Sequence, residues 1–172
     1  MKHYIAILLC VLVNCLSYEN TEIKICLNPY KNLTSITFKT IEGSYKSEGI
    51  KINKGKQIVI KNSNSSLTIN DGLTKYKSIR IRPNQSHAAF SIQTIPSMLN
   101  VKKYNKYIGE LELKSTPQGL KLYLITNIEM YVAGVVEAEA GADQNLEYYK
   151  VQAVICRTYA LANLKRHKDE GY

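Results

Sequence analysis

Hydrophobic and polar residues alternate along most of the chain between residues 21 and 126, in short runs of four to eight positions. This period of two places successive side chains on opposite faces of a β-strand. The runs are TEIKICL (21–27), SITFKTI (35–41), GIKI (49–52), KQIVI (56–60), SLTI (66–69), KSIRIR (77–82), AAFSIQTI (88–95), IGELEL (108–113) and LKLYLI (120–125). Turn-forming pairs separate them, among them Glu42-Gly43, Lys54-Gly55 and Asp71-Gly72, the last of which predicts a hairpin. The pattern predicts a small antiparallel sheet or barrel.

The period changes after Thr126, where helical spacing begins. Val132, Val135, Val136 and Glu139 lie on one side of a helix at 100° per residue, and Glu137 points the other way. Gly141 is expected to end this helix. Asp143 is expected to cap the next.

The second helix is expected to bury residues spaced three and four apart, with Arg157 on the same side. These are Leu146, Tyr149, Ala153, Cys156 and Ala160. The whole pattern predicts an α+β fold, in which a β-rich N-terminal half precedes a helical segment.

The first 17 residues resemble a secretory signal. Lys2 and His3 precede the apolar run from Ile5 to Val13, and small residues follow near position 17. That run is short for a membrane span. We therefore expect residues 1–17 to be removed and the protein to be exported to the periplasm or cell envelope. An alternative is lipoprotein processing at Cys15, since the residues before it loosely resemble a lipobox.

The chain of 172 residues is basic, with 23 Lys and Arg against 14 Asp and Glu, a formal charge of +9 and a pI near 9.3. Such a balance favours anionic partners: nucleic acid, a membrane surface or an anionic cell wall. The lysines of the strands stand largely at outward positions, which also fits a solvated surface. With a secretory signal in front, we expect no nucleic-acid partner.

After the signal, Cys26 and Cys156 remain, and the sequence leaves open whether they form a disulfide.

Glu139 is the unusual residue of the first helix, because it continues an apolar stripe. A carboxyl held against apolar side chains loses hydration, which favours its protonated form. Such a group can donate a proton to a leaving group. The simpler alternative is a glutamate at a helix end that points into solvent or pairs with Arg157.

A longer motif contains this glutamate. Residues 131–161 read YVAGVVEAEAGADQNLEYYKVQAVICRTYAL. They closely resemble the signature of the SpoIID/LytB family, which comprises stage II sporulation protein D and amidase enhancers: Y-[LIV]-x-G-V-V-x-x-E, then E-x-[LY]-K-x-Q-A-[VL]-x-x-R-T-Y. The resemblance extends over about residues 105–172, so we divide the chain into a signal (1–17), a β-rich region (18–104) and a family-type segment (105–172).

The resemblance implies a peptidoglycan lytic transglycosylase, which cleaves glycan strands between N-acetylmuramic acid (MurNAc) and N-acetylglucosamine (GlcNAc) and leaves a 1,6-anhydro product. The essential glutamate of the family corresponds to Glu139, which the resemblance implies acts first as an acid and then as a base. Gln152, Arg157 and Tyr159 match motif positions and are expected to bind the glycan, with Arg157 alternatively orienting Glu139 or joining the two helices as a structural ion pair. The other branch of the family implies a different function, a non-catalytic wall-binding module or one that stimulates a cell-wall amidase.

One departure from the family concerns zinc. Members of the stage II sporulation type carry a Cys- and His-containing segment after this helix, which can bind zinc. The chain stops at HKDEGY (167–172), where His167 could be a first ligand but has no partner cysteines. We therefore expect this chain to be the N-terminal part of a longer protein, with no certain cofactor and zinc only in a longer form.

Overall fold

A computed structural model describes residues 21–27, 33–63, 65–95, 106–141, 143–164 and 166. Among these residues the strands of two antiparallel sheets come first and two helices follow, which confirms the predicted α+β class. The chain divides into two compact units, one of residues Lys24–Ile125 and one of Thr126–Tyr172 together with Met1–Ile23. The expected signal, its lipobox at Cys15 and His167 lie outside the described residues. No helix among the described residues is long and apolar enough to cross a membrane.

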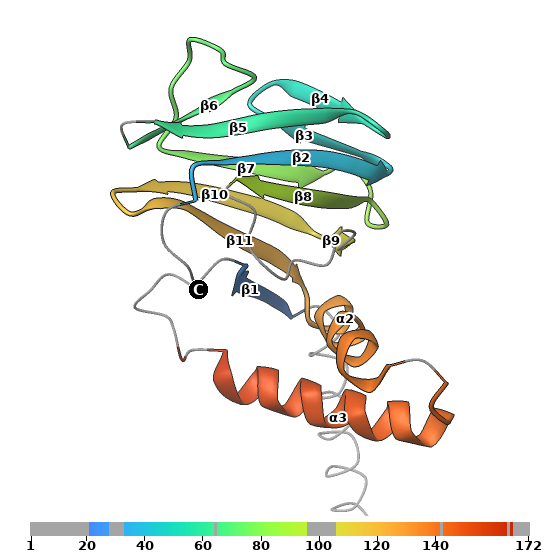
Figure 1. The fold of residues 1–172 in the computed structure, drawn as a ribbon. Coiled ribbons are helices and arrows are strands. Elements are labelled where there is room, and N and C mark those ends of the chain that lie inside the picture. Colours follow the sequence, from blue (N-terminus) through green and yellow to red (C-terminus); the bar gives the residue numbers. More distant parts are fainter. Residues whose placement is uncertain are drawn as a thin grey trace, which may run out of the picture. The chain divides into compact units, whose positions relative to one another are not determined.

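The strands form one sheet of six and one of five (Figure 1). In spatial order the six-stranded sheet contains β1 (Glu22–Cys26), β11 (Gly119–Asn127), β10 (Glu110–Thr116), β7 (Ser78–Pro83), β3 (Ser44–Ser47) and β4 (Ile50–Asn53). The five-stranded sheet contains β6 (Ser66–Ile69), β5 (Gln57–Ser63), β2 (Ser35–Glu42), β8 (Ala89–Ile95) and β9 (Tyr107–Ile108).

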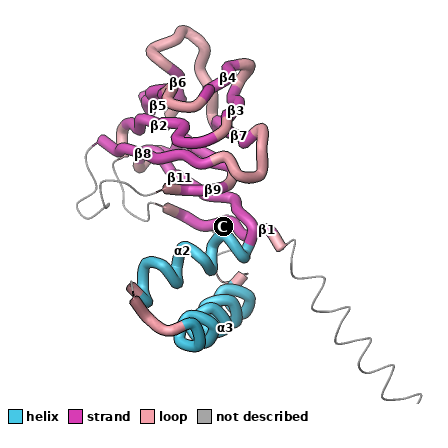
Figure 2. Tube along the Cα trace, turned by 90° about the vertical axis from the view of Figure 1, so that its right-hand side faces the viewer, coloured by secondary structure: helices cyan, strands magenta, loops and turns pink. Residues whose placement is uncertain are grey.

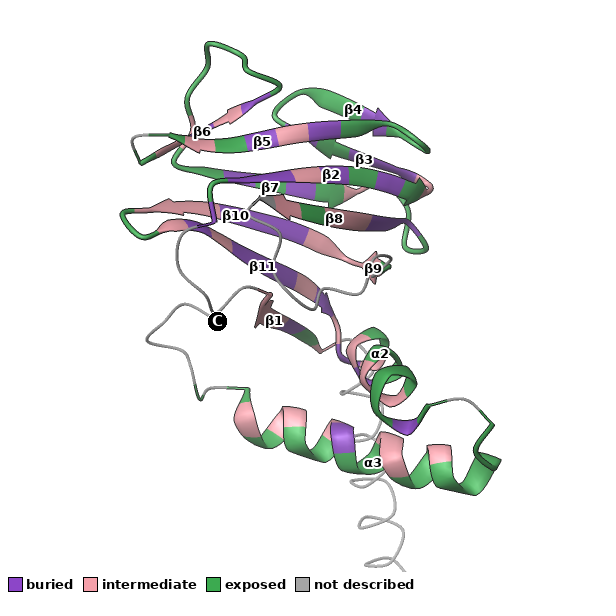
Figure 3. Cartoon of the chain, viewed as in Figure 1, coloured by how far each residue is buried: buried purple, intermediate pink, exposed green. Residues whose placement is uncertain are grey.

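The core of this β-rich part lies between the two sheets. Ile36 and Phe38 of β2 are fully buried in the same cluster as Tyr45 of β3 and Leu111 of β10. Phe38 stacks on Phe90 with ring centroids 4.8 Å apart. The alternation that predicted strands is visible as buried and exposed residues in turn along them (Figure 3). The arrangement is therefore a two-sheet sandwich and not a closed barrel.

The sequence pattern missed two strands, β3 and the two-residue β9. The segment SYKS of β3 has Tyr45 as its only apolar residue, so no alternation marks it. It forms because Glu48 and Gly49, with φ of 45° and 80°, make a two-residue turn into β4. The hairpin predicted at Asp71-Gly72 is present only in part, since an isolated bridge between Leu67 and Tyr76 replaces a second strand.

The two helices are α2 (Ile128–Ala140) and α3 (Leu146–Asn163), drawn in cyan in Figure 2. Gly141, with φ of 70°, ends α2 as expected. The expected N-cap of α3 is wrong. Asn145 caps it, because its extended backbone lets the side-chain oxygen accept from the N–H of Tyr148 at 2.8 Å, whereas Asp143 has φ of 68° in the loop.

Candidate functional site

The site is built on α2 and α3, which pack against each other. Asn127 starts α2 by accepting a hydrogen bond from the N–H of Glu129 at 2.7 Å. Val132 of α2 and Cys156 of α3 are buried. Cys156 is a free thiol, as is Cys26. One residue of the predicted apolar stripe of α2, Val132, is therefore buried.

The loop between the helices is fixed by Tyr149. Its hydroxyl donates to the carbonyl of Gly141 at 3.0 Å and accepts from the N–H of Gln144 at 3.1 Å. One side chain thus ties the C-terminal end of α2 to the first turns of α3. The expected burial of α3 is only partly correct: Cys156 is buried, Tyr149 is half-buried, but Leu146 in the first turn is exposed.

Glu139 lies in the last turn of α2 and its side chain is exposed. The expectation that apolar neighbours shield this carboxyl from water is therefore wrong. Val132 of the stripe is buried, but Val135 and Val136 are only half-buried. Within this unit α3 is the only described helix that packs on α2, so the stripe opens to solvent toward its end. A carboxylate at this position is accessible to a large substrate.

Gln152 is the residue that holds Glu139. Its side-chain N–H donates to a carboxylate oxygen of Glu139 at 3.1 Å, and the same nitrogen lies 3.7 Å from the sulfur of Cys156. The structure thus brings together two of the site residues expected from the sequence. Since an amide donor leaves the second carboxylate oxygen free, Glu139 is oriented and still able to exchange a proton with a bound molecule.

Tyr131 adds a second ionisable group beside this pair. Burial raises the pKa of its phenol, and nearby Cys156, Glu139 and Tyr159 act in the same direction. The phenol therefore stays protonated beside the carboxylate. Tyr131 was not among the site residues predicted from the sequence, although it is the first residue of the motif that contains Glu139.

Arg157 does not contact Glu139. Its guanidinium makes a two-pronged contact with the carboxylate of Glu129 on α2, with Nε 3.0 Å from one oxygen and Nη2 on the other. This contact raises the pKa of Arg157. Of the roles considered from the sequence, the structural ion pair between helices is therefore observed, and the contact with the glycan stays a prediction. Glu129 was missed, because pairing between two helices leaves no trace in local spacing.

The remaining expected residues differ in what the structure says of them. Tyr159 is 61% exposed and lies close enough to Tyr131 to influence the pKa of Tyr131. His167 lies outside the described residues, so its expected metal role stays a prediction. Within the described part of the chain, no three or more His, Cys, Asp or Glu side chains form a group that could hold a metal ion.

The comparisons with known proteins agree with the motif. The family model described as SpoIID, Stage II sporulation protein, matches residues 117–172. These residues are SpoIID-like. The family recognised from the motif is confirmed over this range, which begins later than the expected residue 105 and includes all of α2 and α3. Over these residues the chain is similar to a sporulation-related family. Neither the search of curated proteins nor that of solved structures found a match to the chain.

Proposed function

We propose that the SpoIID-like segment acts in a peptidoglycan lytic transglycosylase, cleaving MurNAc–GlcNAc strands outside the cytoplasm. The observation that supports the proposal best is Glu139, an exposed carboxylate that Gln152 orients at 3.1 Å. It falls at the motif position of the essential glutamate, inside the range that matches the family. Exposure suits a polymeric substrate, which must reach the acid from solution.

The proposed reaction uses Glu139 twice. The protonated carboxyl donates its proton to the glycosidic oxygen, the bond from that oxygen to C1 of MurNAc breaks, and an oxocarbenium-like centre forms at C1. The resulting carboxylate then takes the proton of the C6 hydroxyl while O6 bonds to C1, which closes the 1,6-anhydro ring. No water is activated, so one carboxyl suffices where ordinary glycosidases use two.

The neighbours of Glu139 fit this cycle. Gln152 keeps the carboxyl in one orientation through both proton transfers. Tyr131 stays protonated because burial raises its pKa, so its hydroxyl remains a hydrogen-bond donor beside the site. The exposed ring of Tyr159 offers a flat apolar surface for a sugar.

A second candidate is a non-catalytic module that binds the wall or stimulates an amidase. A basic cavity on the six-stranded sheet, described below, favours this alternative, since it offers cations for anionic wall polymers without needing Glu139. Both functions require export and contact with peptidoglycan. They differ in whether the carboxylate does chemistry.

Replacing Glu139 separates the two. Under the first proposal Glu139→Gln lowers the rate on glycan strands stripped of stem peptides by at least about 100-fold, since general acid–base catalysis contributes at least that much. The matched control is Glu137→Gln, an exposed glutamate two residues away on α2, which should leave the rate unchanged. The products are followed as 1,6-anhydro ends by mass spectrometry. Equal rates for both variants would rule out the proposed role of Glu139.

A further inference from the structure

A surface cavity of about 580 Å³ lies on the β-rich unit, at one edge of the six-stranded sheet. Its walls come from β3, β4, β7 and the turn after β7, and its cations are Lys46, Lys51, Arg80 and Arg82. The cavity belongs to the unit Lys24–Ile125 and contains none of the residues assigned to glycan cleavage.

Three of these cations stand in one row across the sheet. Lys46 of β3 is directly opposite Lys51 of β4 and, on its other side, directly opposite Arg82 of β7. Residues that face each other in this way point to the same face of a sheet, and adjacent strands are about 4.8 Å apart. Like charges directly opposite one another destabilise a sheet. The row is therefore unfavourable for folding unless something anionic compensates for it.

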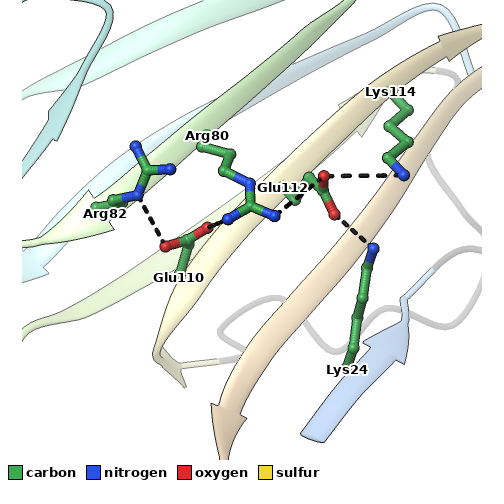
Figure 4. A network of polar contacts seen from close by, with 6 residues as sticks. All are labelled: Lys24, Arg80, Arg82, Glu110, Glu112 and Lys114. Carbon is green, nitrogen blue, oxygen red and sulfur yellow. Dashed lines mark ion pairs between the residues drawn. The ribbon is translucent and has the colours of Figure 1, made fainter. Parts of the chain in front are cut away.

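The protein compensates only one end of this row. Glu110 of β10 is 3.2 Å from both Arg80 and Arg82, and Glu112 is 3.5 Å from Arg80 (Figure 4). In the part of the chain that the structure describes, no ion pair involves Lys46 or Lys51. Glu48, the acidic residue of the β3–β4 turn, also lines the cavity, but it makes no ion pair among those found there. An excess of positive charge thus remains at the outer end.

The opposite wall is polar and fixed. Gln85 accepts from the N–H of Ser44 at 2.9 Å, and the side-chain amide of Asn84 donates to the Ser44 hydroxyl at 2.9 Å. The N–H of Asn84 also donates to the carbonyl of Ser44 at 2.9 Å. A second feature keeps this wall closely packed: a Cβ on Gly43 would lie 2.9 Å from Ala88 Cβ. Hydroxyl and amide groups are therefore held beside the cations.

We propose that this cavity binds a saccharide that carries an oxyanion group, either a carboxylate or a phosphate. Lys46, Lys51 and Arg82 would contact the oxyanion, and the Ser44–Asn84–Gln85 wall would contact sugar hydroxyls. The residues that line the cavity include no aromatic ring. Nucleobases are usually held by aromatic stacking, so a nucleic acid fits less well. The site does not depend on Glu139, so the two proposals can fail separately.

The test is a calorimetric titration of the whole chain with three probes at low ionic strength. The probes are a MurNAc-containing glycan with free lactyl carboxylates, a glycerol-phosphate polymer and a neutral GlcNAc oligomer. We expect at least one anionic probe to bind and the neutral one not to; which anionic probe binds identifies the source. The double variant Lys46→Gln, Lys51→Gln should lose at least tenfold in affinity. The control is Lys75→Gln, Lys77→Gln, which removes the same charge from exposed positions outside the cavity.

A second variant separates binding from folding. Lys51→Glu places an opposite charge across from Lys46, so it should raise the melting temperature while it abolishes anion binding. A merely structural role for Lys51 predicts no loss of binding. The proposal is overturned if neither anionic probe binds, if the control pair loses as much affinity as the cavity pair, or if an oligonucleotide of equal charge binds as tightly as the saccharides.

Discussion

Glu139 is held by a single described side-chain contact, the 3.1 Å hydrogen bond from Gln152. Glu139 is exposed and Gln152 is half-buried, and among the described residues no ion pair fixes the rotamer of the glutamate. The position of the carboxyl relative to a substrate therefore depends on one amide. Small displacements of a catalytic group are costly because proton transfer requires hydrogen-bond distance.

Gln152→Ala tests this dependence. Under the proposed function we expect kcat to fall about tenfold, because the carboxyl samples more orientations, while KM changes little. Gln144→Ala is the control, since Gln144 uses only its backbone N–H in the loop. Steady-state kinetics on glycan strands measures both constants. A rise in KM at constant kcat would instead assign Gln152 to substrate binding.

Tyr45 makes the stability of the β-rich unit depend on alkaline pH. Burial raises the pKa of this phenol above its ordinary value near 10, and its hydroxyl donates to the carbonyl of Ala88 at 2.8 Å. Above about pH 10 the unfolded chain loses the proton and the folded chain keeps it. The unfolded state then binds fewer protons than the folded state. The contribution of Tyr45 to the free energy of unfolding is therefore full below about pH 10 and is lost as the pH rises further.

Tyr45→Phe should therefore cost about 1–2 kcal/mol at pH 7, because the Ala88 carbonyl loses its partner. The difference in free energy of unfolding between the native chain and this variant should shrink between pH 9 and 11. Urea unfolding at several pH values measures it. A constant difference across that range would show that Tyr45 does not cause the alkaline loss.

At the scale of elements, two contacts besides the Gln152–Glu139 hydrogen bond join α2 to α3 or to the loop between them. The Tyr149 hydroxyl fixes the connecting loop, and the ion pair of Glu129 with Arg157 joins the first turn of α2 to the middle of α3. Arg157 belongs to the R-T-Y of the motif, a position the resemblance associates with the glycan. The structure shows its ion pair with Glu129 between the two helices, and the contact with the glycan stays a prediction.

A double-mutant cycle measures this ion pair. Both side chains are about one-third exposed, so we expect a coupling energy of only about 0.5–1 kcal/mol between Glu129→Gln and Arg157→Gln. Thermal unfolding of the four proteins gives the value. If Arg157 acts through this pair alone, kcat on glycan strands stays within about twofold of native. A loss of activity without a measurable coupling energy would instead indicate that Arg157 contacts the substrate.

At the scale of the molecule, the two units differ in how completely each one buries its apolar side chains in a hydrophobic core. The main core cluster lies entirely within Lys24–Ile125, between the two sheets. In contrast, α3 exposes Val151, Val154 and Ile155, so the helical unit buries apolar surface on one side only. Independent stability requires a closed hydrophobic core.

A fragment of residues 21–125 should consequently fold alone. We expect a single cooperative urea transition with an m value of about 1–3 kcal/mol/M. Circular dichroism measures this transition. The fragment 126–172 should show no such transition, because the faces of its helices away from their contact stay in water. The β-rich fragment remaining unfolded in buffer would contradict this division.

Much of the fold follows from the sequence. The alternating runs located nine of the strands, and the change of period near residue 127 located the helices, because burial of one face imposes a periodicity on the chain. The sequence pattern did not predict the strand β3, because Tyr45 is its only apolar residue and a turn with positive φ creates it. The motif also predicted Glu139 and Gln152 as site residues, and the structure brings these two side chains together.

Only the tertiary structure decided which side chains meet. It paired Arg157 with Glu129 and Gln152 with Glu139, exposed Glu139, and aligned Lys46, Lys51 and Arg82 in one row. Local spacing determines the face of an element on which a residue lies. Contacts between elements depend on register and on which helix or strand packs alongside, and these follow from the packing of the chain as a whole.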